Sequence, residues 1–248
     1  MIVVKSPAEL DAMREANRVV ARVLEAVKAE VRPGIATIRL DAMAEELCRS
    51  LGARPGFKGY HGYPYSLCCS PNEQVVHGFP SATPLAEGDI LSMDFGAVLD
   101  GFYGDAATTV AVGRISEAAR RLLEATEAAL AAGIEQCRAE RRLGDVSAAV
   151  QRVAEGAGFS VVRQFVGHGI GRNLHEEPQV PNFGAAGRGV TLKPGMVLAI
   201  EPMVNAGDYA VEILDDGWTA VTADGKLSAH FEHTVAITED GPRILSLP

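Results

Sequence analysis

The residues best suited to chemistry in this sequence are acids and histidines beside glycines or at the ends of apolar runs. Asp94 and Asp105 lie on either side of Asp100-Gly101, and four more segments follow in the second half of the chain. These are 167–171 with His168, 174–178 with His175, 200–203 with Glu201, and 230–237 with Glu232. Three or four carboxylates with one imidazole form a ligand set that suits Mn, Fe, Co or Zn. Each residue alone would more often be structural, so the metal site is predicted from the set.

The dipeptide Asp100-Gly101 brings the two aspartates together. Asp-Gly between two strand-like runs is typical of a type I′ turn joining antiparallel strands. Pairing of Leu99 with Phe102 across this turn makes Asp94 and Asp105 diagonal neighbours on one face. Two carboxylates in an apolar sheet repel each other and resist desolvation, and a divalent cation removes both problems. The alternative, two solvated edge residues, is disfavoured by the apolar strand positions around them.

Two better-known motifs are absent. The run Gly167-His168-Gly169-Ile170-Gly171 is followed by Arg172, so it does not match the GxGxxG loop of dinucleotide-binding proteins. The chain contains neither HExxH nor GxSxG, and the segment 175–178, HEEP, resembles a zincin motif only superficially.

The helices and strands predicted along the chain must bring these residues together. Ser6-Pro7-Ala8-Glu9 is a capping box with proline at the first helical position, which predicts a helix ending before Pro33-Gly34. Apolar periodicity predicts three further helices: from Thr37 to Gly52, from near Ser116 towards Cys137, and from Asp145 to Gly158. Strands and turns are predicted over 53–112, and further strands over 160–165, 196–200, 217–221 and 227–237.

The order of helix, helix and strands occurs twice along the chain. Gly88–Asp94 matches Gly195–Glu201, each a turn glycine, an apolar strand and an acid six residues after the glycine. We therefore predict a duplicated α/β unit with acids at matching strand positions. Nothing between the halves is typical of a linker, so we expect one domain, 1–248, with pseudo-repeats over about 6–112 and 116–237.

The composition indicates a globular intracellular protein. The chain has 248 residues, 47% hydrophobic and 22% charged, which is enough for a sizeable core. Its net charge of −9 disfavours nucleic acid as the main ligand. It has no run of about 20 apolar residues and no signal-peptide pattern. Its four cysteines form no CxxC pair, so we expect a reduced, cytoplasmic protein.

Six segments, in order and spacing, resemble the type I methionine aminopeptidases of the bacterial type without an N-terminal zinc-binding extension. They are 76–80 (VHGFP), the Asp94/Asp105 pair, 167–172 (GHGIGR), 175–178 (HEEP), 199–203 (AIEPM) and 231–234 (FEHT). The resemblance implies the pita-bread fold, an α/β (α+β) fold in which two pseudo-symmetric helix-helix-strand halves form a central curved, mostly antiparallel sheet. It also implies hydrolytic removal of the initiator methionine when the second residue is small.

The resemblance implies two divalent ions (Co, Mn, Fe or Zn) on five ligands: Asp94, Asp105, His168, Glu201 and Glu232. Asp105 and Glu232 would bridge the ions, with Asp94 on one ion and His168 and Glu201 on the other. Glu201 would also accept the proton of the attacking water. A monovalent cation near Asn72 or Ser228, as in some relatives, is left open.

His77 and His175 are implied to contact the substrate, His175 at the scissile carbonyl and His77 at the amide nitrogen or peptide backbone. The resemblance also places a methionine pocket at Tyr60, His61, Tyr63, Cys68 and Trp218, where aromatics and a thiol match an unbranched, polarisable side chain. The alternative is that these aromatics only pack in the core. Phe57 and Leu174 replace the cysteine and the aromatic that bacterial members often carry at the pocket rim.

Three alternatives compete with this prediction. Proline-directed pita-bread peptidases, of the prolidase or aminopeptidase P kind, usually carry a sizeable N-terminal domain, whereas here the first catalytic helix begins at Ser6. A type II methionine aminopeptidase needs a long insertion between His175 and Glu201, where only 25 residues intervene. A catalytically inactive binding relative would lose ligands, and all five are present. We expect a monomer that acts on nascent chains near the ribosome, that does not have nucleic acid as its main ligand, and that does not bind membranes.

Overall fold

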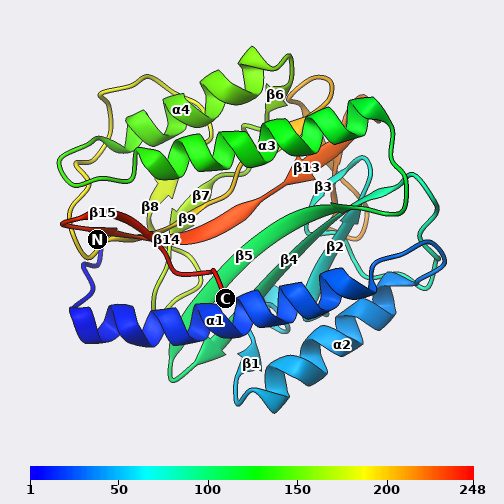
Figure 1. Cartoon of the computed structure of the whole chain (residues 1–248), viewed down its shortest axis with the longest axis horizontal. Coiled ribbons are helices and arrows are strands. Elements are labelled where there is room, and N and C mark those ends of the chain that lie inside the picture. Colours follow the sequence, from blue (N-terminus) through cyan, green and yellow to red (C-terminus); the bar gives the residue numbers. More distant parts are fainter.

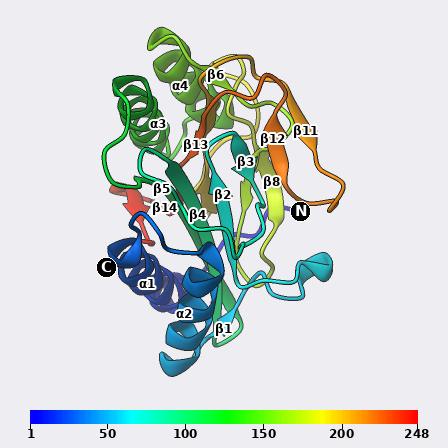
Figure 2. The ribbon, with the colours of Figure 1, turned by 90° about the vertical axis from the view of Figure 1, so that its right-hand side faces the viewer.

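The computed structural model describes residues 1–248. Four helices occur in two pairs, one in each half of the chain (Figure 1). They are α1 (Pro7–Glu30) and α2 (Thr37–Ser50), then α3 (Glu117–Glu135) and α4 (Leu143–Gly156). Figure 2 shows the four helices on one side of the large sheet. None of the helices combines the length and the apolar composition that a membrane crossing needs.

The large sheet has nine strands, and all of its neighbouring strands are antiparallel. Its path runs β1-β4-β5-β14-β9-β7-β8, with β2 paired to β4 and β15 to β14. The strands are β1 (Arg54–Pro55), β2 (Leu67–Pro71), β4 (Ile90–Leu99), β5 (Phe102–Ala111), β7 (Gly167–Gly169), β8 (Glu176–Val180), β9 (Val197–Ile200), β14 (Glu232–Thr238) and β15 (Gly241–Ile244).

Two three-stranded sheets complete the fold. One is ordered β13-β10-β6 and the other β11-β12-β3. Their strands are β3 (Gln74–Val76), β6 (Ser160–Val161), β10 (Met203–Asn205), β11 (Val211–Ile213), β12 (Ala220–Thr222) and β13 (Ser228–His230). A short 3-10 helix, η1 (Tyr60–Gly62), lies between β1 and β2.

The predicted hairpin is confirmed residue by residue. Leu99 pairs with Phe102 and Asp94 with Ala107 along β4 and β5. Asp100 and the following glycine have φ of 49° and 79°, the left-handed backbone that a type I′ turn requires. The turn therefore fixes the register that sets the two aspartates on one face.

The helix predictions are confirmed, with one correction at the fourth helix. Ser6 caps α1 through a capping box with Glu9, and Ser116 caps α3. The fourth helix begins at Leu143 and not at Asp145. The Asp145 carboxylate accepts a hydrogen bond of 2.9 Å from the Arg142 backbone N–H. It therefore caps the helix from its first turn instead of preceding it.

Three predicted strands differ from the observed ones. The segment 160–165 forms only the two-residue β6, and 217–221 is replaced by β12. Asp216 accepts hydrogen bonds from the backbone N–H groups of Trp218 and Thr219, which holds this region in a turn before β12 begins. The single strand predicted over 227–237 is broken at Phe231, and its two parts join different sheets.

Side chains alternate between the two faces of the sheet along the central strands, so one set faces the helices and the other set faces the open side, away from the helices. Met93 and Phe95 of β4 and Ala106 of β5 pack in one buried cluster with α1 and α2. Ile200 of β9 and Val235 of β14 pack in another with α3 and α4. In each of these strands, the positions on either side of the packed residues point to the opposite face of the sheet. An acid lies on that face, either within the strand or directly after it.

Candidate metal centre

Four carboxylates converge on the open face of the sheet. Asp94 lies in β4, Asp105 in β5, Glu201 directly after β9, and Glu232 at the first position of β14. Each half of the chain supplies two of them, and the halves meet where Glu232 pairs with Ala107 of β5. Asp105 and Glu232 are only 3% and 2% exposed. Buried acids in this density need a compensating positive charge.

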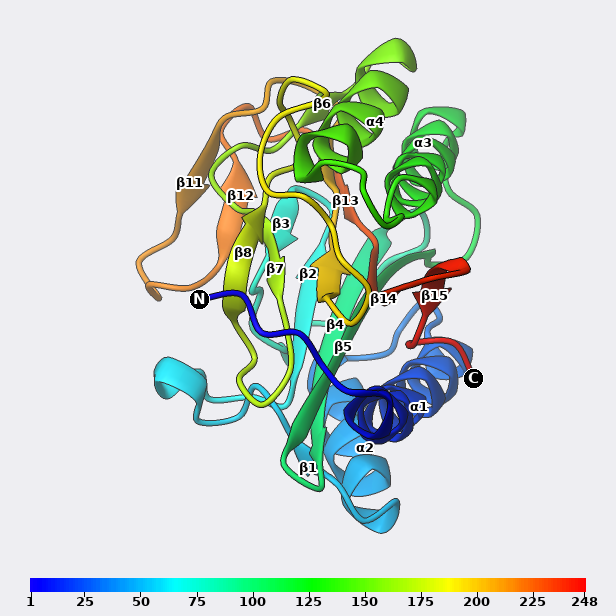
Figure 3. The same cartoon turned by 90° about the vertical axis from the view of Figure 1, so that its left-hand side faces the viewer.

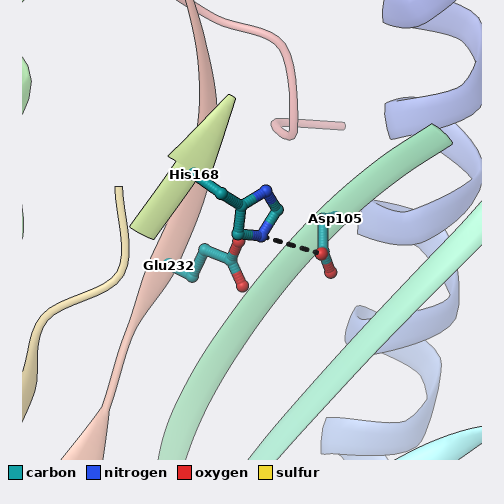
Figure 4. Close-up of side chains that lie close together, drawn as sticks. All are labelled: Asp105, His168 and Glu232. Carbon is teal, nitrogen blue, oxygen red and sulfur yellow. Dashed lines mark ion pairs between the residues drawn. The ribbon is translucent and has the colours of Figure 1, made fainter. Parts of the chain in front are cut away.

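His168 in β7 faces the same group of acids. Its Nε2 atom lies 3.9 Å from Asp105 Oδ2 and 3.5 Å from Glu201 Oε1. Figure 4 shows the ring directed between Asp105 and Glu232. The Nδ1 atom lies 2.9 Å from the Gly169 carbonyl oxygen. Donation from Nδ1–H to that oxygen leaves the Nε2 lone pair free, which is the usual arrangement of a metal-ligating histidine.

The glycines on either side of His168 allow the neighbouring strands to approach closely. A Cβ atom at Gly167 would collide with the Ala199 carbonyl oxygen of β9. One at Gly169 would collide with the backbone of Glu177 in β8. These glycines therefore place the imidazole beside the acids by letting β7 pack between its neighbours.

Burial and mutual repulsion determine the charge state of the cluster. Burial raises the pKa of Asp94 to about 7. Burial, followed by the charges of neighbouring acids, raises the pKa values of Asp105, Glu201 and Glu232 well above their ordinary range. Burial, with a smaller effect of His175, lowers the pKa of His168 to about 3, so its imidazole is neutral at pH 7.

The donor atoms fit a divalent cation. Asp94 Oδ1, Asp105 Oδ1 and Glu232 Oε1 are buried and have no hydrogen-bond partner. One ligand atom each from Asp105, His168 and Glu232 lie within 4.8 Å of one another. Buried oxygens without partners are costly, and a cation between them would satisfy all of them at once.

The cluster forms one wall of a pocket of about 200 Å³. Every residue that the sequence analysis placed in the site lines it, together with Phe57 and Leu174 from the expected rim. The wall beside the acids is apolar and aromatic, with Tyr63 and Trp218 rings 5.2 Å apart and the Cys68 side chain buried. The pocket thus combines a polar, acidic wall with an apolar slot.

Two further histidines, His77 and His175, line the same pocket. His77 follows β3 with a positive φ of 61°, and its ring lies 6.2 Å from that of Trp218. The His175 ring lies 4.4 Å from that of His168, and the Tyr60 hydroxyl lies 2.7 Å from His175 Nδ1. Burial lowers the pKa of His77 to about 4 and also lowers that of His175. Both rings are therefore neutral at pH 7.

Sequence reasoning assigned no role to His230, which the structure places against Glu201. The residue is 1% exposed, and its Nε2 atom lies 3.7 Å from Glu201 Oε2 without a hydrogen-bond partner. The available signal was that His230 lies two residues before Glu232, because side chains two apart share one face of a continuous strand through strand alternation. The break at Phe231 obscures that alternation.

The fold and the site define a metallopeptidase, and the chain belongs to metallopeptidase family M24, whose model matches residues 11–239. Within this family its similarity is to methionine aminopeptidases. It is 56% identical to the methionine aminopeptidase of Clostridium perfringens, over 100% of this chain and 99% of the relative. It is 52% identical to methionine aminopeptidase 1 of Bacillus subtilis, over 99% of each.

Among solved structures, the methionine aminopeptidase of Thermotoga maritima superimposes with a TM-score of 0.98 and 47% identity, over 100% of both chains. The predicted resemblance to type I methionine aminopeptidases and the predicted pita-bread fold are confirmed. The proline-directed alternative is not favoured by these relatives.

Proposed function

We propose that this chain hydrolyses the bond after an N-terminal methionine, in peptides and nascent proteins whose second residue is small. One observation carries the proposal: a single pocket joins the buried acids to the apolar slot lined by Tyr63, Cys68 and Trp218. A methionine side chain is unbranched, apolar and polarisable, and it matches such a slot. With that side chain in the slot, the scissile carbonyl lies beside the acids.

We infer that Asp94, Asp105, His168, Glu201 and Glu232 hold two divalent ions. Four carboxylates balance the charge of two such ions, and the neutral His168 offers a free Nε2 lone pair. When bound, ions of this kind lower the pKa of water and stabilise negative charge on the substrate oxygen. Mn, Fe, Co and Zn all suit the donor set.

The chain's own groups would then move the proton and hold the substrate. Glu201 accepts a proton from water as the water oxygen bonds to the carbonyl carbon. The same proton passes to the nitrogen of the departing peptide as the C–N bond breaks. His175 donates a hydrogen bond to the carbonyl oxygen, where negative charge develops. His77 contacts the amide nitrogen or the peptide backbone.

We further propose that the chain works as one domain, 1–248, and as a cytoplasmic monomer that meets nascent chains near the ribosome. The four cysteines are free and buried, which is compatible with a reducing compartment. The net charge of −9 favours a peptide over nucleic acid as the main ligand.

A panel of three tripeptides tests the proposed function. Met-Ala-Ser, Pro-Ala-Ser and Ala-Pro-Ser are each incubated with the chain in the presence of Mn²⁺, Fe²⁺ or Co²⁺. Release of methionine from Met-Ala-Ser alone is the expected result. Cleavage of Ala-Pro-Ser would transfer the function to the proline-directed class, and no cleavage with any metal would leave a binding protein.

A further inference from the structure

His175 lies in a segment that has little regular structure of its own. Residues 171–175 form a bend before β8, and His175 is only partly buried. A group that must present a hydrogen bond to the substrate needs a fixed ring orientation. Two contacts made by distant parts of the chain, one with the ring and one with the neighbouring Glu176, are placed to supply it.

The first contact comes from the Tyr60 hydroxyl, 2.7 Å from His175 Nδ1. Tyr60 belongs to η1 in the other half of the chain, and its ring centre lies 5.3 Å from that of His175. This hydroxyl makes no other hydrogen bond within the chain, and it donates to Nδ1 in the tautomer in which that nitrogen carries no proton. The imidazole proton then lies on Nε2, which becomes a donor.

The second contact is a buried ion pair next to His175. Lys5 Nζ lies 2.7 Å from Glu176 Oε2, and the two side chains are only 3% and 8% exposed. Glu176 Oε1 also accepts a hydrogen bond of 3.1 Å from the Asn173 backbone N–H. One carboxylate therefore joins the N-terminal segment to both sides of His175.

The N-terminal segment is itself anchored. The Lys5 backbone N–H donates to the Gly195 carbonyl oxygen at 2.8 Å, and Lys5 Nζ also lies 3.2 Å from the Val3 carbonyl oxygen. Figure 3 shows this segment crossing the molecule beside β7 and β8 before α1 begins. Gly171 leaves room for the pair, because a Cβ atom there would lie 2.7 Å from Lys5 Cε and 2.8 Å from Glu176 Oε1.

We propose that Tyr60 and the Lys5–Glu176 pair are positioning residues for His175, holding the ring so that Nε2–H is presented to the substrate carbonyl. Tyr60 thereby has a role beyond the methionine slot, and Lys5 acts on the site through Glu176. The importance of this ring orientation for turnover rests on the proposed function. The orientation and the proton position do not.

The test is ¹⁵N NMR of the histidine rings in the full-length chain, with and without Zn²⁺. The chain has six histidines, and a His175→Ala variant assigns the His175 signals. Protonated and unprotonated ring nitrogens have well separated ¹⁵N frequencies, so the spectrum reports which nitrogen carries the proton. The wild-type chain is expected to show one His175 form, with the proton on Nε2 and a hydrogen bond at Nδ1.

Two variants remove the contacts. Tyr60→Phe deletes only the hydroxyl, and it is expected to shift the Nδ1 signal and to populate a second His175 form. Lys5→Met combined with Glu176→Gln replaces the ion pair without leaving a buried charge unpaired, and it is expected to broaden or split the His175 signals. Matched controls are Tyr65→Phe, outside the pocket lining, and Lys58→Met, whose ion pair with Glu45 is partly exposed. Both controls should match the wild-type spectrum.

Kinetics add a second readout. Loss of one hydrogen bond worth about 1 kcal/mol predicts a fall in kcat of about five- to tenfold for Tyr60→Phe on Met-Ala-Ser, with KM little changed. A wild-type proton on Nδ1, or a Tyr60→Phe spectrum identical to the wild type, would overturn the role of Tyr60. An unchanged spectrum in the double variant would overturn the role of the ion pair. Failure of the proposed function would instead appear as no turnover by the wild-type chain, with the NMR result unaffected.

Discussion

Neutralising Asp94 should make the metal-free protein more stable while it removes a metal ligand. Asp94 Oδ1 is buried and has no hydrogen-bond partner, and burial raises the pKa of the carboxyl from 3.8 to about 7. Since each pKa unit corresponds to about 1.4 kcal/mol, ionising Asp94 within the fold costs about 4 kcal/mol. We expect Asp94→Asn to recover about 2–4 kcal/mol at pH 8, because the amide itself still needs hydrogen-bond partners.

The direction of the pH dependence of stability follows from the linkage between proton binding and folding. When the pKa of a carboxyl is higher in the folded than in the unfolded chain, the folded state loses stability as pH rises from about 4 through 7. The loss is complete above pH 7. The difference between the Asp94→Asn variant and the wild type should therefore be largest at pH 8 and small at pH 4. Asp145 serves as a control of opposite sign. Its pKa is lowered by hydrogen bonds from the backbone N–H groups of Arg142 and Gly187, so Asp145→Asn should destabilise at pH 8.

Urea unfolding with excess EDTA, at pH 4 and pH 8, measures both variants. A parallel series with Mn²⁺ should reverse the order, because a bound ion stabilises the folded wild type by mass action and the variant lacks a ligand. If Asp94→Asn were less stable than the wild type at pH 8 in EDTA, the assignment of Asp94 as a buried, uncompensated charge would be wrong.

Three further substitutions test separate parts of the pocket. Trp218→Ala opens the apolar slot, and we expect KM for Met-Ala-Ser to rise about tenfold or more while Mn²⁺ affinity, measured by calorimetry, stays the same. His175→Ala should lower kcat about 100-fold with little change in KM, as for a lost oxyanion donor, in steady-state assays. Gly169→Ala should weaken Mn²⁺ binding and lower the midpoint of urea unfolding, because its Cβ would collide with the Glu177 backbone and displace His168; unchanged metal affinity would contradict this account of the glycine.

The parts of the site that could be predicted from sequence are those fixed by local geometry. A two-residue turn at Asp100-Gly101 sets the register of its strands, so the meeting of Asp94 and Asp105 follows from residue spacing alone. The capping box at Ser6 and the apolar periodicity likewise locate the helix starts to within two residues.

What could not be predicted depends on contacts between distant segments. The pairing of β5 with β14 brings Glu232 to Asp105, and only the family resemblance, not any local pattern, implied that these two acids meet. The break at Phe231 sends β13 and β14 into different sheets, which a continuous apolar run cannot reveal. The contact between Tyr60 and His175 joins segments 115 residues apart, and no local pattern encodes it.

The most direct test of the central claim is release of methionine from Met-Ala-Ser as Mn²⁺ is added to the metal-free chain. The wild type should be inactive in excess EDTA and reach full activity by about two equivalents of tightly bound Mn²⁺, whereas Asp105→Asn should stay inactive. Full activity of the wild type in excess EDTA, or equal activation of the Asp105→Asn variant, would contradict the assignment of these buried acids as the metal centre.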